Sequence, residues 1–170
     1  MNFKELAEKR YSCRSFSPQP VEQSKLDEII ASAIKAPTAV NKQPYKIFHL
    51  ESEAAKEAIK ASTPCIFGAE TFLVVGGKKS EAWTREFDQR NFADVDASIV
   101  ATHLMLAIYA NGLASTWVGH FDAIKLRELC PEMKDYDLIA VFPIGYPAAD
   151  GGPSTRHFDR KDKSEVVSVI

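Results

Sequence analysis

The sequence predicts a single α+β domain in which a small mixed sheet is covered by helices. Three observations support this: three short β-rich runs, apolar stretches with helical spacing between them, and no repeat or long linker that would divide the chain. With 170 residues, of which 45% are hydrophobic and 26% charged, the chain can bury a sizeable core. We therefore expect one domain over residues 1–170.

Three helices follow from caps and apolar spacing. Asn2 can cap a short helix that ends at the first basic cluster, and a second helix, with apolar residues every three or four positions, runs from Pro20 toward Pro37. The longest helix should cover residues 96–111 and stop at Gly112. It is apolar nearly all round, so it must be covered on most sides, either as a central core helix or against its twin in a dimer.

The predicted strands are residues 45–50, 72–75 and 138–144, each a short apolar or β-branched run. Residues 148–154 form a long surface loop rich in glycine and alanine. The tail at 165–170 has the composition of a strand, which could pair within the chain or with a partner.

Bulk properties narrow the function classes. The formal net charge of −2, with both signs interspersed, argues against nucleic acid or an anionic membrane as a partner. No apolar run approaches the length of a bilayer span and no signal peptide is visible, so we expect a cytoplasmic protein. Cys13, Cys65 and Cys130 form no metal or disulfide pattern and read as reduced thiols.

Well-known catalytic motifs are missing from the sequence. It has no Ser-His-Asp elbow, no GxGxxG and no phosphate-binding loop of the NTPase type. This argues against a hydrolase, a Rossmann dehydrogenase and an NTPase.

Two basic clusters stand at opposite ends of the chain and could close on one anion. Arg10, Ser12 and Arg14 alternate, so an extended backbone would point them to one face. Arg160 and Lys161 form the second cluster. The alternative interpretation is a solvated basic turn at one end and a flexible charged tail at the other.

Between these clusters lies a polar turn, residues 37–44. Its two prolines, Pro37 and Pro44, exclude a helix, while Thr38, Asn41 and Gln43 supply polar contacts. The combination suits a phosphorylated ligand with an amide-bearing ring, although a plain loop bounded by prolines remains the alternative.

These segments, followed by the later run 112–119, resemble the flavin-dependent nitroreductase family, in particular its smaller members, over nearly the whole chain. The resemblance implies a nitroreductase-like sheet sandwiched by helices and an intertwined homodimer with two flavin mononucleotides (FMN) at the interface. It also implies NADH or NADPH as reductant and ping-pong hydride transfer through the flavin to a small-molecule acceptor, such as a nitroaromatic or a quinone.

The resemblance assigns roles to both basic clusters. Arg10, Ser12 and Arg160 would hold the FMN phosphate, and Lys161 would add background charge. Arg14 would face the pyrimidine edge and tune the flavin, and Tyr11 belongs to the same cofactor-binding run.

Two further segments correspond to family motifs. Residues 37–45 resemble a PSxxNxQPW motif that reaches the flavin of the other subunit, with Thr and Tyr in place of the usual Ser and Trp; the matching residues are Pro37, Thr38, Ala39, Asn41 and Gln43. A second run would lie over the flavin face with an N–H directed at N5: Trp117, Val118, Gly119 and His120. His120 departs from the family, where a small residue is usual, and would line the pocket or be an ordinary surface residue.

No residue stands out as a catalytic acid or nucleophile, which fits chemistry carried by a bound flavin. We expect no metal. The alternative from another class is a non-catalytic flavin-binding or regulatory protein of the same fold, whose binding motifs would be identical.

Overall fold

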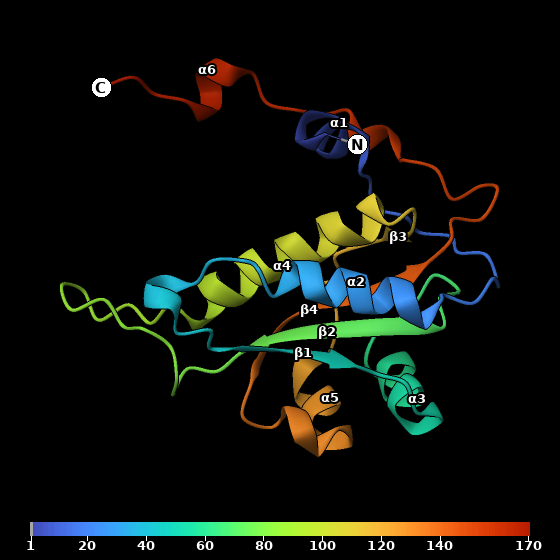
Figure 1. The fold of residues 1–170 in the computed structure, drawn as a ribbon, viewed down its shortest axis with the longest axis horizontal. Coiled ribbons are helices and arrows are strands. Elements are labelled where there is room, and N and C mark those ends of the chain that lie inside the picture. Colours follow the sequence, from blue (N-terminus) through green and yellow to red (C-terminus); the bar gives the residue numbers. More distant parts are fainter. Residues whose placement is uncertain (1) are drawn as a thin grey trace.

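Four strands form the centre of the molecule, with helices on both faces (Figure 1). The structure is a computed structural model that describes residues 2–170. Its helices are α1 (Phe3–Lys9), α2 (Gln23–Ala33), α3 (Glu53–Ser62), α4 (Ala93–Ala110), α5 (Ala123–Leu129) and α6 (Lys163–Val166), with 3₁₀ turns η1 (Ala39–Asn41), η2 (Pro131–Met133) and η3 (Thr155–His157). The strands are β1 (Tyr45–His49), β2 (Thr71–Gly77), β3 (Ala114–Ser115) and β4 (Asp137–Gly145).

The sheet has the order β1-β2-β4-β3, and each neighbouring pair is antiparallel. The α+β class and the three predicted strands are confirmed, but these four strands are not mixed in direction. Over residues 2–170 the one parallel pairing is an isolated bridge between Ser12 and Ser115. That bridge attaches the N-terminal segment to the β3 edge of the sheet.

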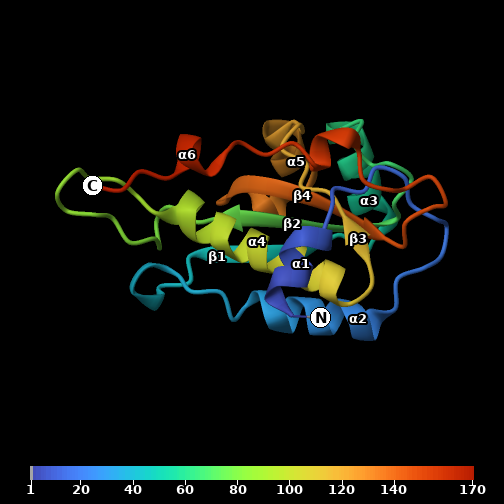
Figure 2. The ribbon, with the colours of Figure 1, turned by 90° about the horizontal axis from the view of Figure 1, so that it is seen from above.

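Strand β2 is apolar at successive positions because both of its faces are buried. Phe72 and Val74 pack into a core shared with α3 and α5, while Leu73 and Val75 pack into a second core shared with α2 and α4. The sheet therefore has one layer of helices on each face, as both ribbon views show (Figures 1 and 2).

Helix α4 begins three residues earlier than predicted and ends at Ala110, before Gly112 with a φ of 75°. Over residues 2–170 it is the one helix long and apolar enough to cross a membrane by length and composition, so the expectation that no apolar run reaches this length was wrong. Its place explains its composition: residues such as Val100 and Leu104 are fully buried against α2 and the sheet. It is the core helix of the fold.

The tail does not form the predicted strand. A capping box between Asp162 and Glu165 nucleates the short helix α6, and the residues after it are extended and exposed. Figure 1 shows this tail passing α1 and ending away from the sheet. The apolar side chains at its end, including Val169 and Ile170, are fully exposed in the described structure.

Candidate functional site

The two predicted basic clusters meet because the N-terminal segment is tied to the loop after β4. Ser15 Oγ donates to Asp150 Oδ1 at 2.8 Å, and the Cys13 thiol donates to the carbonyl of Gly151 at 3.3 Å. The amide of Cys13 also donates to the carbonyl of Ser115 at 3.0 Å. Figure 2 shows the result: the segment after α1 and the segment around η3 lie side by side, although about 140 residues separate them in the chain.

A cavity of about 210 Å³ opens where these segments meet. Three of its residues come from the first cluster, and four from residues 154–160, the segment that carries Arg160 of the second: Arg10, Ser12 and Arg14, and Ser154, Arg156, His157 and Arg160. We call this cavity the arginine pocket. No carboxylate lines it.

The electrostatics of the arginine pocket favour an anion. Burial lowers the pKa of the Arg10 guanidinium, and the positive charge of Arg160 lowers it further. None of its four arginines forms an ion pair within residues 2–170. Guanidinium groups with free donors match the geometry of a phosphate, so the chemistry of the pocket is that of a phosphate site.

Alternation along the first segment places Tyr11 outside the pocket. Its ring packs edge to face on Tyr109, with 6.2 Å between ring centroids, on the opposite side from Arg10 and Ser12. Lys161 also lies outside: it lines a neighbouring hollow with Phe158 and Glu165, which shares Arg160 with the arginine pocket. The structure therefore gathers Arg10, Ser12, Arg14 and Arg160 but leaves these two predicted residues apart.

Sequence reasoning missed three residues of the arginine pocket: Ser154, Arg156 and His157. The turn η3 brings Arg156 and His157 to the same side as Arg160. The available signal was their position in one short basic segment, because a single helical turn places residues three or four apart on one face.

Residues 117–120 follow β3, the strand to which the N-terminal segment is bridged at Ser115. The Trp117 ring packs edge to face on Phe142, at 5.4 Å between centroids, and Val118 exchanges both backbone hydrogen bonds with Val141. At Gly119 an added Cβ would meet no atom of residues 2–170 within 4 Å, so packing within the described chain does not require glycine there. His120 is exposed, and its carbonyl accepts a hydrogen bond from Thr63 Oγ1 at 2.6 Å.

The 37–44 segment lies at the opposite end of α4 from the arginine pocket. It contacts the first turn of that helix, where the Ala39 amide donates to Asp96 Oδ1 at 2.8 Å, whereas the pocket adjoins β3 beyond the helix's last turn. Helix α4 has 18 residues, which gives it a length of about 27 Å at 1.5 Å per residue. Within one chain, the two predicted parts of the site are not brought together.

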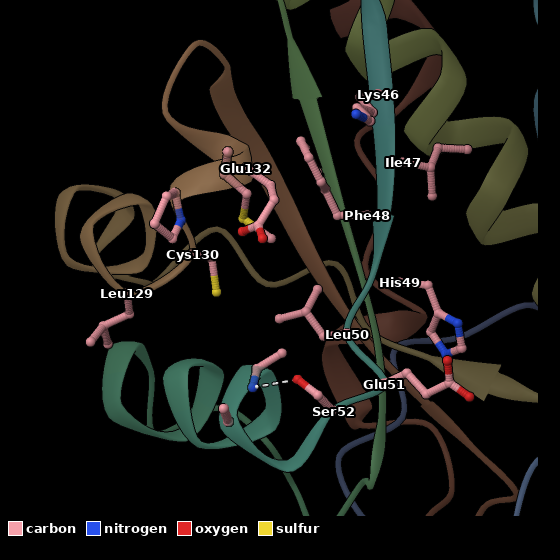
Figure 3. A pocket seen from close by; sticks show the side chains of 14 residues that line it. Lys46, Ile47, Phe48, His49, Leu50, Glu51, Ser52, Leu129, Cys130 and Glu132 are labelled. Carbon is pink, nitrogen blue, oxygen red and sulfur yellow. Dashed lines mark hydrogen bonds between the residues drawn. The ribbon is translucent and has the colours of Figure 1, made fainter.

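A larger cavity, of about 570 Å³, lies between β1, the start of α3 and η2 (Figure 3). Phe48, Leu50 and Cys130 point into it, while Ile47 and His49 lie on the other side of β1. It contains none of the predicted site residues and no cluster of arginines. The candidate site is therefore defined by its chemistry and not by the size of the cavity.

Comparison with protein families identifies the class. The sequence model of the nitroreductase family matches residues 7–64 and 60–146, which together cover most of the chain. The chain belongs to the nitroreductase family, as the resemblance of its motifs predicted.

Individual relatives agree with this assignment. The chain is 28% identical to a protein from Thermus thermophilus named NADH dehydrogenase, over an alignment of 192 positions that covers 92% of each. A solved nitroreductase family protein from Clostridium difficile is 36% identical and superposes with a TM-score of 0.91, covering 99% of this chain and 98% of that one. A nitroreductase solved in complex with FMN, from Exiguobacterium sibiricum, shares the fold at 17% identity, with a TM-score of 0.83 and coverage of 100% and 98%.

Proposed function

We propose that this protein is an FMN-dependent NAD(P)H oxidoreductase that reduces small electron-poor acceptors such as nitroaromatics or quinones. The observation that carries the proposal is the arginine pocket, in which four guanidinium groups converge and no carboxylate is present. Family membership makes the protein an oxidoreductase. The relatives named for NADH or NAD(P)H and the FMN-bound neighbour support the choice of cofactor and reductant.

The residues present fit the phosphate of FMN. Arg10, Ser12 and Arg160 supply donors from two segments, with Arg156 and His157 beside them. A volume of about 210 Å³ is below the roughly 300–1,000 Å³ of complete small-molecule sites, so the pocket suits one end of a ligand. The chain also lacks the glycine-rich turn that holds a dinucleotide, which favours FMN over the adenine dinucleotide.

The flavin would supply the redox chemistry, taking hydride from NADH or NADPH and passing it to the acceptor in a ping-pong cycle. The task of the chain is to bind and orient. Ser12 and Arg14 point to the same side of one extended segment. With Ser12 at the phosphate, Arg14 would lie beside it and direct its positive charge at the flavin ring. The run 117–120 leaves the same edge of the sheet and would cover one face of that ring.

We further propose that the working unit is a homodimer with the flavin between the two subunits. Val95 and Ile99 lie half-buried on the outer face of α4 and line a groove of about 450 Å³. Val166 and Ile170 in the tail are exposed. A second copy would cover these apolar surfaces and bring its own 37–44 segment to the arginine pocket. The cysteines are all free, which agrees with a reducing compartment such as the cytoplasm.

The absorbance spectrum of the purified protein tests the proposal. We expect a flavin spectrum, release of FMN and not FAD on heating, bleaching by NADH or NADPH without oxygen, and recovery when a quinone is added. No flavin after reconstitution contradicts the proposal. Flavin that binds but is not bleached on a catalytic timescale supports the alternative of a flavin-binding protein without turnover.

A further inference from the structure

A carboxylate, that of Asp96, is buried in the core away from the arginine pocket. Asp96 is 1% exposed and lies in the first turn of α4. Its Oδ1 accepts a hydrogen bond from the Ala39 amide at 2.8 Å, and its Oδ2 has no partner within residues 2–170. The positive end of the helix dipole stabilises a negative charge at this position, but burying a carboxylate remains costly. The contact with Ala39 is the specific interaction that offsets part of this cost.

The segment that Asp96 contacts is conformationally strained. Val40, Asn41 and Gln43 have φ values of 44°, 55° and 53°, in the left-handed region that non-glycine residues rarely adopt. For the β-branched Val40 this is a pronounced outlier. Such strain persists only where surrounding contacts hold it, and it concentrates at ligand clamps.

Most hydrogen bonds of residues 38–43 stay inside the segment and so cannot fix its position on the fold. The Gln43 amide donates to Thr38 Oγ1 at 3.0 Å, and its side-chain nitrogen donates to the carbonyl of Asn41 at 3.3 Å. Within the described chain, the 37–44 segment reaches more distant residues through three hydrogen bonds: the one from Ala39 to Asp96, a backbone bond of 2.8 Å from the Lys78 amide to the carbonyl of Pro44, and a longer one, 3.5 Å, from Lys42 Nζ to the carbonyl of Ala82. The bond at Pro44 continues the pairing of β1 with β2 and holds the end of the segment, so Asp96 is the short, buried attachment of its strained part, residues 38–43.

We propose that Asp96 is a positioning residue of the flavin site. By holding the Ala39 amide, it keeps the strained 38–43 segment in the conformation that presents Asn41 and Gln43 to the flavin of the second subunit. The inference rests on the proposed function. It adds a residue that touches neither flavin nor substrate and acts through the segment.

The test compares Asp96→Ala and Asp96→Asn with Asp94→Asn as a matched control. Asp94 is exposed in the same helical turn, so its replacement removes the same charge without touching the segment. Hydrogen–deuterium exchange of peptides spanning residues 36–44 reports the hold on the segment without any flavin. Titration of the apoprotein with FMN, followed by flavin fluorescence, reports the consequence for the site.

We expect D96A to speed exchange in the segment and to weaken FMN binding about tenfold or more, the scale of a lost hydrogen bond to a charged group. D96N keeps an oxygen that can accept from Ala39, so binding should stay within about threefold of the wild type. D94N should match the wild type in both measurements. If D96A does not fold, Ala39→Pro removes the same donor at a position compatible with proline and should reproduce the loss.

Two outcomes overturn the inference. Unchanged segment exchange and FMN affinity in D96A or A39P would show that the carboxylate is merely structural, even if the melting temperature falls. Equal losses in D94N and D96A would show a general charge effect at the helix start. If the wild type binds no FMN, the proposed function fails instead, and the exchange data alone decide whether Asp96 holds the segment.

Discussion

The two halves of the candidate site are built in opposite ways. The arginine pocket is closed by contacts within one chain, such as those from Ser15 to Asp150 and from Cys13 to Gly151. The 37–44 segment is largely exposed, carries three strained residues and sits at the other end of α4. One half is complete by itself, whereas the other presents polar side chains and an exposed Val40 to the outside.

This difference shows what a single chain can and cannot supply. In the proposed site, the donors for the phosphate would be in position before any ligand binds, so that part of the affinity would need little reorganisation. The 37–44 segment, which would contact the ring of the ligand, lies at the far end of α4 from the arginine pocket. Two copies related by a two-fold axis would pair each pocket with the segment of the other copy, because such an interface uses the same surface twice.

The largest expected effect is at the arginine pocket. Arg10→Ala and Arg160→Ala should each weaken FMN binding by about 1.5–3 kcal/mol, the scale of a hydrogen bond between charged groups. Lys161→Ala is the control, since Lys161 lies outside the pocket, and should change binding by less than about 0.5 kcal/mol. Titration of the three apoproteins at constant salt decides. Equal losses at all three positions would indicate a diffuse charge effect, and the arginine pocket would then not be a preformed half of the site.

The intrachain closure of the pocket can be tested at Gly151. An added Cβ there would lie 2.5 Å from the carbonyl oxygen of Ser15 and 3.0 Å from the amide nitrogen of Ala148. Gly151→Ala should therefore cost about 1–3 kcal/mol of unfolding free energy, the range for overpacked sites, and weaken FMN binding with it. Gly152→Ala, where no atom lies within 4 Å, should stay within about 0.5 kcal/mol in urea denaturation. A stable G151A variant with normal binding would show that this closure does not shape the pocket.

A smaller effect is expected at Arg14, which lines the exposed side of the pocket. Arg14→Ala should leave the phosphate contacts intact but lower the flavin midpoint potential by about 10–20 mV. An exposed charge contact of up to about 1 kcal/mol corresponds to that shift for a two-electron couple. Redox titration against a reference dye measures it. Loss of flavin with no change in potential would instead assign Arg14 to the phosphate.

Local signals predicted much of the fold. Asn2 and Glu5 form the capping box of α1, and Gly112 marks the end of α4. Strand β3, with two residues, is too short for a periodicity to show. The tail was predicted as a strand from its β-branched residues, but the box between Asp162 and Glu165 starts a helix first.

The part of the candidate site that lies on the extended N-terminal segment was predictable from the sequence. The alternation of Arg10, Ser12 and Arg14 put them on one face, and the same alternation should have excluded Tyr11. Arg156 had a different local signal, its place in a short basic segment with Arg160, which a turn brings to one side. Asp96 could not be identified from any short sequence window, because its role depends on a loop-to-helix contact between residues far apart in the chain.

Complementation between two defective chains tests the central claim, that one flavin site combines the arginine pocket of one copy with the 37–44 segment of another. The first chain would carry Arg10→Ala with Arg160→Ala, and the second Asn41→Ala with Gln43→Ala. Each should bind FMN weakly alone, while a mixture refolded together should regain wild-type affinity at a single site per hybrid dimer, because one pocket then meets one intact segment. A refolded mixture that binds FMN no better than the two separate variants would contradict the account.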